Sequence, residues 1–177
     1  MKKKVAIVDF GLGNLLSIQR ALKFLDFDNE IVQDGSSIDF DNPIILPGVG
    51  AFPVAMENIG KNRLKDVLIQ AATNDVPIIG ICLGMQILFE DSEEHKKTTG
   101  LGLLQGSVVK LKDVSCTIED SRLPVIGWRN VVTKECLDSG KNSLKLKVNN
   151  KSFYFVHSYH AIVRNQEMII ASYSRNG

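Results

Sequence analysis

The chain has 177 residues, of which 44% are hydrophobic, and its formal net charge is +1. That length can bury one sizeable core, and the balanced charge lacks the strongly basic footprint of proteins that bind nucleic acid or anionic membranes. The apolar run after the basic residues 2–4 is interrupted at Asp9 and never reaches membrane-spanning length. We therefore expect a cytoplasmic protein with a small-molecule or protein partner, which binds neither nucleic acid nor a membrane.

The chain contains three cysteines, Cys82, Cys116 and Cys136. Their odd number and wide spacing, with no Cys-x-x-Cys pair, argue against both a disulfide framework and a zinc site. We expect free thiols, no metal and no cofactor.

The first half of the chain alternates strand-like with helix-like segments. Short apolar runs predict strands at 4–8, 31–32, 44–46 and 77–81, and apolar residues at helical spacing predict helices at 15–25 and 64–71. Later β-prone runs, separated by Asn, Gly and Ser, predict strands at 108–109, 131–132, 153–156 and 169–170. These patterns predict a single α/β domain over residues 1–177, with a mostly parallel sheet and added antiparallel strands in the second half.

The segment Gly80-Ile81-Cys82-Leu83-Gly84-Met85-Gln86 places one cysteine between two glycines, where a strand is predicted to turn into a helix that continues through Phe89. A tight strand-to-helix turn needs small residues two before and two after its central residue, which carries strained backbone angles. The N-terminal end of a helix also favours a thiolate. The pattern predicts that Cys82 is a nucleophile.

The glycine-rich loop Pro47-Gly48-Val49-Gly50-Ala51-Phe52 follows another predicted strand, so both features are expected at the carboxyl edge of the sheet. Backbone N–H groups of this loop, together with that of Leu83, would form an oxyanion hole. The alternative is that its glycines only make a turn. Gly11-Leu12-Gly13 is not a dinucleotide motif, because Leu16 occupies the position of the third glycine; we expect a turn with Asn14 near the helix cap.

A cysteine nucleophile normally works with an imidazole base, and the candidates are His95, His157 and His160. None matches convincingly. His95 lies in a polar loop typical of a solvated surface. His157 and His160 follow the predicted strand 153–156, where they either line the site or are structural.

Together these residues resemble the class I glutamine amidotransferases, most closely the glutaminase subunits of imidazole glycerol phosphate synthases in histidine biosynthesis. The matching segments are Asp9–Leu15, Leu46–Phe52, Gly80–Gln86, Gly127-Trp128 and Phe155–Tyr159. The resemblance covers almost the whole chain and implies a flavodoxin-like three-layer fold.

The resemblance also implies roles for individual residues. Cys82 would attack the side-chain amide of L-glutamine and form a thioester, and ammonia would pass to a (β/α)₈-barrel synthase partner. The implied oxyanion hole comprises Val49, Gly50 and Leu83; the implied glutamine-binding residues are Gln86, Glu94, His157 and Ser158; the implied partner interface includes Asn14 and Trp128.

Some residues depart from the family pattern. The family's His-Pro-Glu segment, which carries the base and its orienting carboxylate, does not occur, so we expect a truncated or incomplete chain whose 177-residue form is nearly inactive. Val125, Arg129 and Leu16 also replace usual family residues. These differences leave open a paralogue that modifies surface-polysaccharide sugars, and a non-catalytic interaction subunit. A thiol sensor on a similar fold is a weaker alternative.

Overall fold

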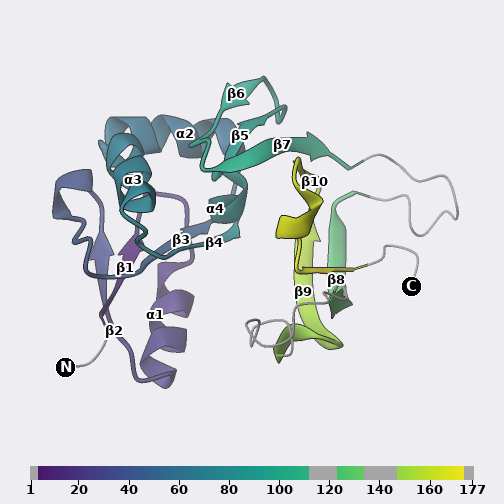
Figure 1. Ribbon diagram of the computed structural model, residues 1–177, viewed down its shortest axis with the longest axis horizontal. Helices are drawn as coiled ribbons and strands as arrows, with labels where there is room; N and C mark the ends of the chain where they lie inside the picture. The colour runs from purple at the N-terminus through teal and green to yellow at the C-terminus, as the bar shows by residue number, and fades with distance from the viewer. Residues whose placement is uncertain (1–3, 112–122, 134–146, 174–177) are drawn as a thin grey trace, which may run out of the picture. The chain divides into compact units, whose positions relative to one another are not determined.

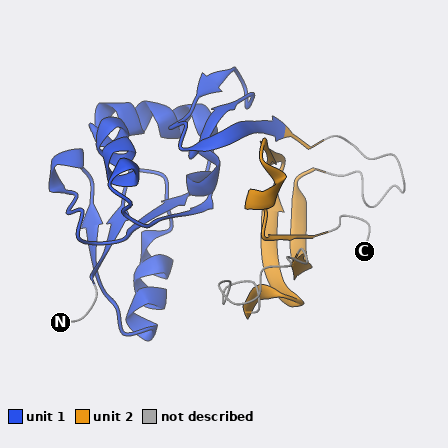
Figure 2. Cartoon of the chain, viewed as in Figure 1, with its two compact units in different colours: residues 1–109 blue, residues 110–177 orange. Residues whose placement is uncertain are grey.

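The computed structural model describes residues 4–111, 123–133 and 147–173. The chain forms two compact units, residues 1–109 and 110–177, shown in different colours in Figure 2. Each unit is described by itself below. The single-domain organisation over 1–177 stays a prediction.

Unit 1 is built on a four-stranded parallel sheet with the order β2-β1-β3-β4 (Figure 1). Its strands are β1 Lys4–Val8, β2 Asp28–Val32, β3 Ile44–Gly48 and β4 Ile78–Cys82. The two inner strands are buried almost continuously, as expected for a parallel sheet covered on both faces. All four predicted strands of the first half are thereby confirmed.

Three helices cover this sheet: α1 Leu15–Phe24, α2 Phe52–Lys61 and α3 Leu64–Thr73. Helix α1 packs through Leu15, Ile18 and Leu22 on a core that includes Val5 and Ile7 of the central strand β1. Helices α2 and α3 lie on the opposite face (Figure 1). The sequence predicted α1 and α3 but not α2.

The segment after β4 differs from its prediction. Helix α4 spans only Leu83–Gln86, and Phe89 already begins strand β5, so the helix predicted through Phe89 is wrong. The backbone carbonyls of residues 87–89 accept hydrogen bonds from the N–H groups of Leu101, Leu104 and Gly102, at 2.8 to 3.1 Å. These long-range partners replace the helical bonds that the local sequence favours.

A smaller sheet completes unit 1. Strand β5 (Phe89–Ser92) pairs with β6 (Thr98–Thr99) in antiparallel and with β7 (Leu104–Lys110) in parallel orientation. A short 3₁₀ helix, η1 (Gly35–Ser37), follows β2.

Unit 2 is mainly antiparallel, with the strand order β11-β8-β9. Its elements are β8 Val125–Thr133, β9 Lys151–His157, β10 Tyr159–Val163, the 3₁₀ helix η2 Gln166–Met168 and β11 Ala171–Ser172. The strands predicted around 131–132 and 153–156 are confirmed. The strand predicted at 169–170 is wrong. The Ile169 N–H donates to the Gln166 carbonyl and closes the 3₁₀ turn, and pairing with β8 starts only at Ala171.

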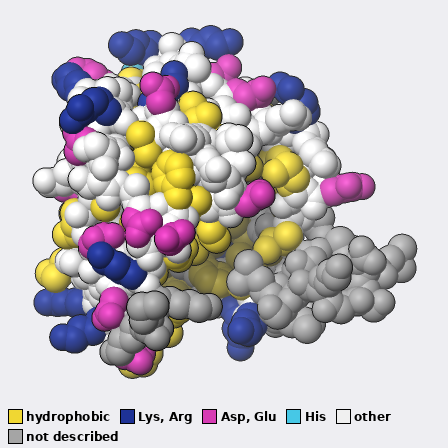
Figure 3. Space-filling view, turned by 60° about the vertical axis from the view of Figure 1, so that its left-hand side comes forward, with side chains coloured by type: hydrophobic (Ala, Val, Ile, Leu, Met, Phe, Trp, Pro, Cys, Tyr) yellow, Lys and Arg dark blue, Asp and Glu magenta, His cyan; other side chains and the backbone are white. Residues whose placement is uncertain are grey.

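Among the described residues, no helix is long and apolar enough to cross a membrane, and no group of three or more His, Cys, Asp or Glu side chains could hold a metal ion. Figure 3 shows one face of the molecule, on which Lys and Arg side chains are interspersed with Asp and Glu. This mixing agrees with the formal charge of +1.

Candidate functional site

Cys82 lies at a strained strand-to-helix turn, as predicted. It is the last residue of β4 and the N-cap of α4, with φ 55° and ψ −117°. This backbone conformation is rare for a residue with a side chain, and such strain concentrates at functional sites. The thiol is exposed and free, whereas Cys116 and Cys136 lie outside the described residues. Because α4 has only one turn, few peptide dipoles align there, and the predicted helix field at Cys82 is weak.

Close backbone packing explains both glycines of the turn. A Cβ atom on Gly80 would lie 2.7 Å from the Met85 nitrogen, and one on Gly84 would overlap the Leu46 carbonyl of the neighbouring strand. Neither site therefore accepts a side chain unless α4 moves away from the sheet. Because Gly80 and Gly84 have no side chains, the single turn of α4 can pack directly against β3 and β4.

The strand register brings the glycine-rich loop next to Cys82. Gly48, the last residue of β3, pairs with Cys82, and Leu46 pairs with Gly80. Neighbouring strands lie about 4.8 Å apart, so Val49 and Leu83 leave the sheet from adjacent points at its carboxyl edge. The predicted meeting of the loop and the cysteine turn at this edge is confirmed.

Two backbone features constrain the loop. The Val49 N–H donates to the Leu12 carbonyl at 3.1 Å, and Gly50 has a φ of 107° that favours glycine. For the Val49 N–H to face a developing oxyanion, its bond to Leu12 would have to be exchanged. The oxyanion-hole roles of Val49, Gly50 and Leu83 stay predictions.

Glu94 contacts the start of α2, directly after the loop. Its Oε2 accepts a hydrogen bond from the Phe52 N–H at 2.8 Å, and Ala51 provides no side-chain cap for this helix. The Glu94 N–H in turn donates to the hydroxyl of the fully buried Ser92 at 3.1 Å. Glu94 therefore ties the turn after β5 to the end of the glycine-rich loop.

The remaining predicted residues of unit 1 lie near these elements or at the start of α1. Gln86 is the half-buried last residue of α4, one turn beyond Cys82. Asn14 is the N-cap of α1, as expected, and its Oδ1 accepts from the Ser17 N–H at 3.2 Å. Their roles in binding glutamine and a partner stay predictions.

His157, Ser158 and Trp128 belong to unit 2. His157 ends β9, Ser158 separates β9 from β10, and the Ser158 carbonyl accepts from the Leu111 N–H at 2.9 Å. Trp128 is 66% exposed on β8 and makes an edge-to-face contact with Tyr154, with 5.6 Å between ring centroids.

The histidines are poor matches for a catalytic base, as the sequence suggested. His157 Nδ1 lies 2.9 Å from the Tyr159 carbonyl and Nε2 lies 2.6 Å from the Tyr173 hydroxyl, so both ring nitrogens have structural partners. Burial and the nearby His157 hold the pKa of His160 below its usual value. His95 is exposed in a turn with a positive φ of 59°.

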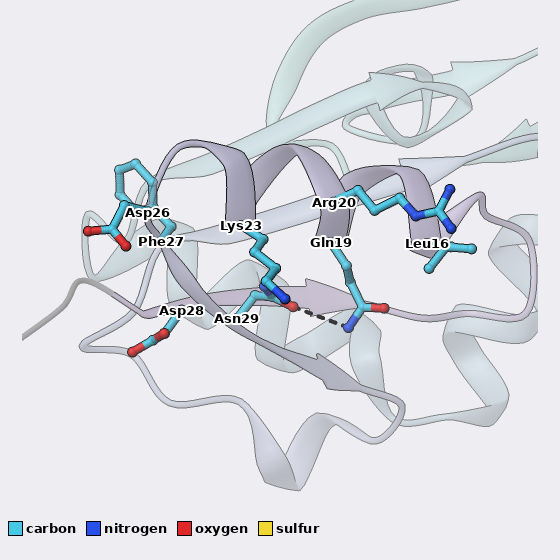
Figure 4. Close-up of a pocket in the computed structure, with 8 residues that line it drawn as sticks. All are labelled: Leu16, Gln19, Arg20, Lys23, Asp26, Phe27, Asp28 and Asn29. Atoms are coloured by element: carbon cyan, nitrogen blue, oxygen red, sulfur yellow. Dashed lines mark hydrogen bonds between the residues drawn. The ribbon is translucent and has the colours of Figure 1, made fainter.

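A separate surface pocket of about 680 Å³ lies between α1 and β2 (Figure 4). Its lining balances two cations, Arg20 and Lys23, against two carboxylates, Asp26 and Asp28. Asp28 starts β2, at the amino edge of the parallel sheet. Cys82 lies at the opposite, carboxyl edge, so this pocket is not part of the cysteine site.

Comparison with known proteins agrees with this geometry. The model of the family Glutamine amidotransferase class-I matches residues 6–177. The chain belongs to the class I glutamine amidotransferases. It is 41% identical over 168 residues to the imidazole glycerol phosphate synthase subunit HisH of Bacillus licheniformis, with 95% of this chain and 77% of that protein covered. It is 44% identical over 159 residues to the subunit HisH of Methanocaldococcus jannaschii, with 88% and 73% covered.

Solved structures support the fold of this glutamine amidotransferase. PurLQS from Thermotoga maritima matches with a TM-score of 0.69 and 20% identity, covering 98% of this chain and 75% of that one. A glutamine amidotransferase from the same organism matches with a TM-score of 0.55 and 15% identity, covering 94% and 65%. The predicted amidotransferase fold, with its mostly parallel sheet and added antiparallel strands, is confirmed.

Sequence reasoning missed three contacts of residues in or next to the matching segments, two of them in unit 1 and one in unit 2. They are the hydrogen bonds from the Val49 N–H to the Leu12 carbonyl, from the Phe52 N–H to Glu94, and between the Tyr173 hydroxyl and His157. Leu12 belongs to the segment Gly11-Leu12-Gly13, for which the sequence predicts only a turn. The other two pairs join residues 42 and 16 positions apart, and no local pattern signals them.

Proposed function

We propose that this chain is the glutaminase component of an imidazole glycerol phosphate synthase, which serves histidine biosynthesis. The observation that carries the proposal is the pairing of Gly48 with Cys82, because it sets a glycine-rich loop beside a strained, exposed thiol. The similarity to HisH subunits supports the choice of synthase over a polysaccharide-modifying paralogue.

In the proposed reaction, the Cys82 thiolate attacks the side-chain carbonyl carbon of L-glutamine. The C–S bond forms as the carbonyl becomes an oxyanion. Backbone N–H groups of Gly50 and Leu83 stabilise it, together with that of Val49 once this group has exchanged its bond to Leu12. Collapse of this intermediate breaks the C–N bond and releases ammonia, whose nitrogen takes a proton from a general acid. Water then hydrolyses the thioester to glutamate and restores the thiol.

Binding of glutamine is assigned to Gln86, Glu94, His157 and Ser158. A carboxylate suits the ammonium group of the substrate, and it has two oxygens. Glu94 Oε2 holds the Phe52 N–H, so Oε1 can accept from the ammonium group while the cap of α2 persists. The Glu94 side chain would thus both bind the substrate and hold the end of the glycine-rich loop.

The ammonia is proposed to pass to a (β/α)₈-barrel synthase subunit that contacts Asn14 and Trp128. Large exposed aromatic side chains are frequent anchors of protein interfaces, and Trp128 is 66% exposed. The general acid is expected from the family's His-Pro-Glu segment, which is not among the 177 residues.

The test is glutamate formation from L-glutamine by the full gene product together with its synthase partner. Cys82→Ala should abolish turnover, while Ser37→Ala, at the end of the 3₁₀ helix η1 that follows β2, serves as the control. Unchanged glutaminase activity in Cys82→Ala would refute the proposal. Partner binding by a wild-type protein that has no turnover would instead identify a non-catalytic interaction subunit.

A further inference from the structure

The His157 side chain is held at both ring nitrogens within unit 2. Its Nδ1 lies 2.9 Å from the backbone carbonyl of Tyr159, and its Nε2 lies 2.6 Å from the hydroxyl of Tyr173. A carbonyl oxygen only accepts, so the Nδ1 atom must carry a proton. In the neutral ring, Nε2 is then the acceptor, and the Tyr173 hydroxyl donates to it.

Packing of the aromatic rings orients the hydrogen bond between Tyr173 and His157. The Tyr173 ring lies 4.5 Å from the Phe155 ring, and its plane is nearly perpendicular to the His157 ring, at 89°. Tyr173 directly follows β11, which pairs with β8, whereas Phe155 and His157 belong to β9. The hydroxyl therefore joins the segment after β11 to the end of β9.

We infer that Tyr173 is a positioning residue for the glutamine site, acting through His157 on the turn from His157 to Tyr159. This inference rests on the proposed function, which assigns His157 and Ser158 to glutamine binding. Ser158 alone separates β9 from β10, so the orientation of its peptide groups depends on the residues at either side.

Two attachments hold this turn. The Leu111 N–H binds the Ser158 carbonyl at 2.9 Å, and the His157 ring bridges the Tyr159 carbonyl to Tyr173. Without the Tyr173 hydroxyl, Nε2 loses its donor, and the imidazole is free to rotate away from the Tyr159 carbonyl. The first attachment would remain, so the strand pair should persist while the turn loses its fixed orientation.

Tyr173→Phe tests the inference, because it removes the hydroxyl and keeps the ring that packs on Phe155. In the full gene product with its synthase partner, KM for L-glutamine should rise about tenfold, the effect of one lost hydrogen bond, while kcat changes much less. Tyr154→Phe is the matched control, since it also removes a tyrosine hydroxyl from unit 2, and Tyr154 lies on β9 with His157 but its ring contacts Trp128. It should leave KM unchanged.

The route through His157 is tested by a double-mutant cycle. In a His157→Ala background, Tyr173→Phe should raise KM no further, because the hydroxyl then has no imidazole to hold. Additive effects of the two substitutions would overturn the route through His157.

If Tyr173→Phe has the wild-type KM and Cys82→Ala is inactive, this inference fails while the proposed function stands. If wild-type protein does not turn over glutamine, the proposed function fails and this inference fails with it. A lower Tm with unchanged KM would show that Tyr173 only stabilises the fold.

Discussion

Glu94 is expected to serve two partners, and two substitutions separate them. Its Oε2 accepts from the Phe52 N–H at the start of α2, and its charge is proposed to hold the ammonium group of glutamine. Glu94→Gln keeps a carbonyl acceptor for Phe52 but removes the charge. Glu94→Ala removes both. Stability and substrate affinity should therefore respond differently in the two variants.

The magnitudes follow from the contacts. Loss of a helix cap costs about 0.5–2 kcal/mol, and Ala51 offers no replacement side chain, so Glu94→Ala should lower the free energy of unfolding by about 1–2 kcal/mol. For a chain of this size, this corresponds to a fall in Tm of about 2–8 °C. Glu94→Gln should lower Tm much less. Both variants should raise KM for glutamine by about 10–100-fold, since a charge-assisted hydrogen bond is lost.

The assays are thermal unfolding of the isolated chain and glutaminase kinetics of the full gene product with its partner. Glu93→Ala, which removes the adjacent exposed carboxylate, is the control and should leave KM unchanged. Equal losses of Tm in Glu94→Gln and Glu94→Ala would refute the role of Oε2 as a cap. A wild-type KM in Glu94→Gln would refute the role of its charge in substrate binding.

Three further predictions concern the stability of unit 1. Gly84→Ala would drive a Cβ into the Leu46 carbonyl, so we expect a loss of at least about 1–3 kcal/mol in urea unfolding and slower alkylation of the displaced cysteine. Asn14→Ala removes the α1 cap and should cost about 1 kcal/mol, whereas Asn14→Asp should retain it; thermal unfolding distinguishes them. Hydrogen bonds, chiefly from the Ser36 hydroxyl, lower the pKa of Asp34 to about 2. Its contribution to stability is complete above about pH 4 and lost toward pH 2, so the deficit of Asp34→Asn in urea unfolding should shrink over that range.

Local sequence predicted the elements whose side-chain pattern already signals their type and burial. The strand at 4–8 was predicted with its observed bounds because a continuous apolar run suits the middle of a parallel sheet. Helix α2 escaped prediction, and its first N–H is capped by Glu94, 42 residues later in the chain. The helix expected through Phe89 failed for a related reason, since its carbonyls bind N–H groups of residues 101–104.

The sequence alone determined which residues form the cysteine turn, because only glycines tolerate the backbone contacts at positions 80 and 84. It also indicated that the glycine-rich loop and Cys82 share one edge of the sheet. Only the tertiary structure decided their register, the Leu12 bond that occupies the Val49 N–H, and the tyrosine that holds His157. These contacts join residues distant in sequence, so they depend on how the strands pair and not on local propensity.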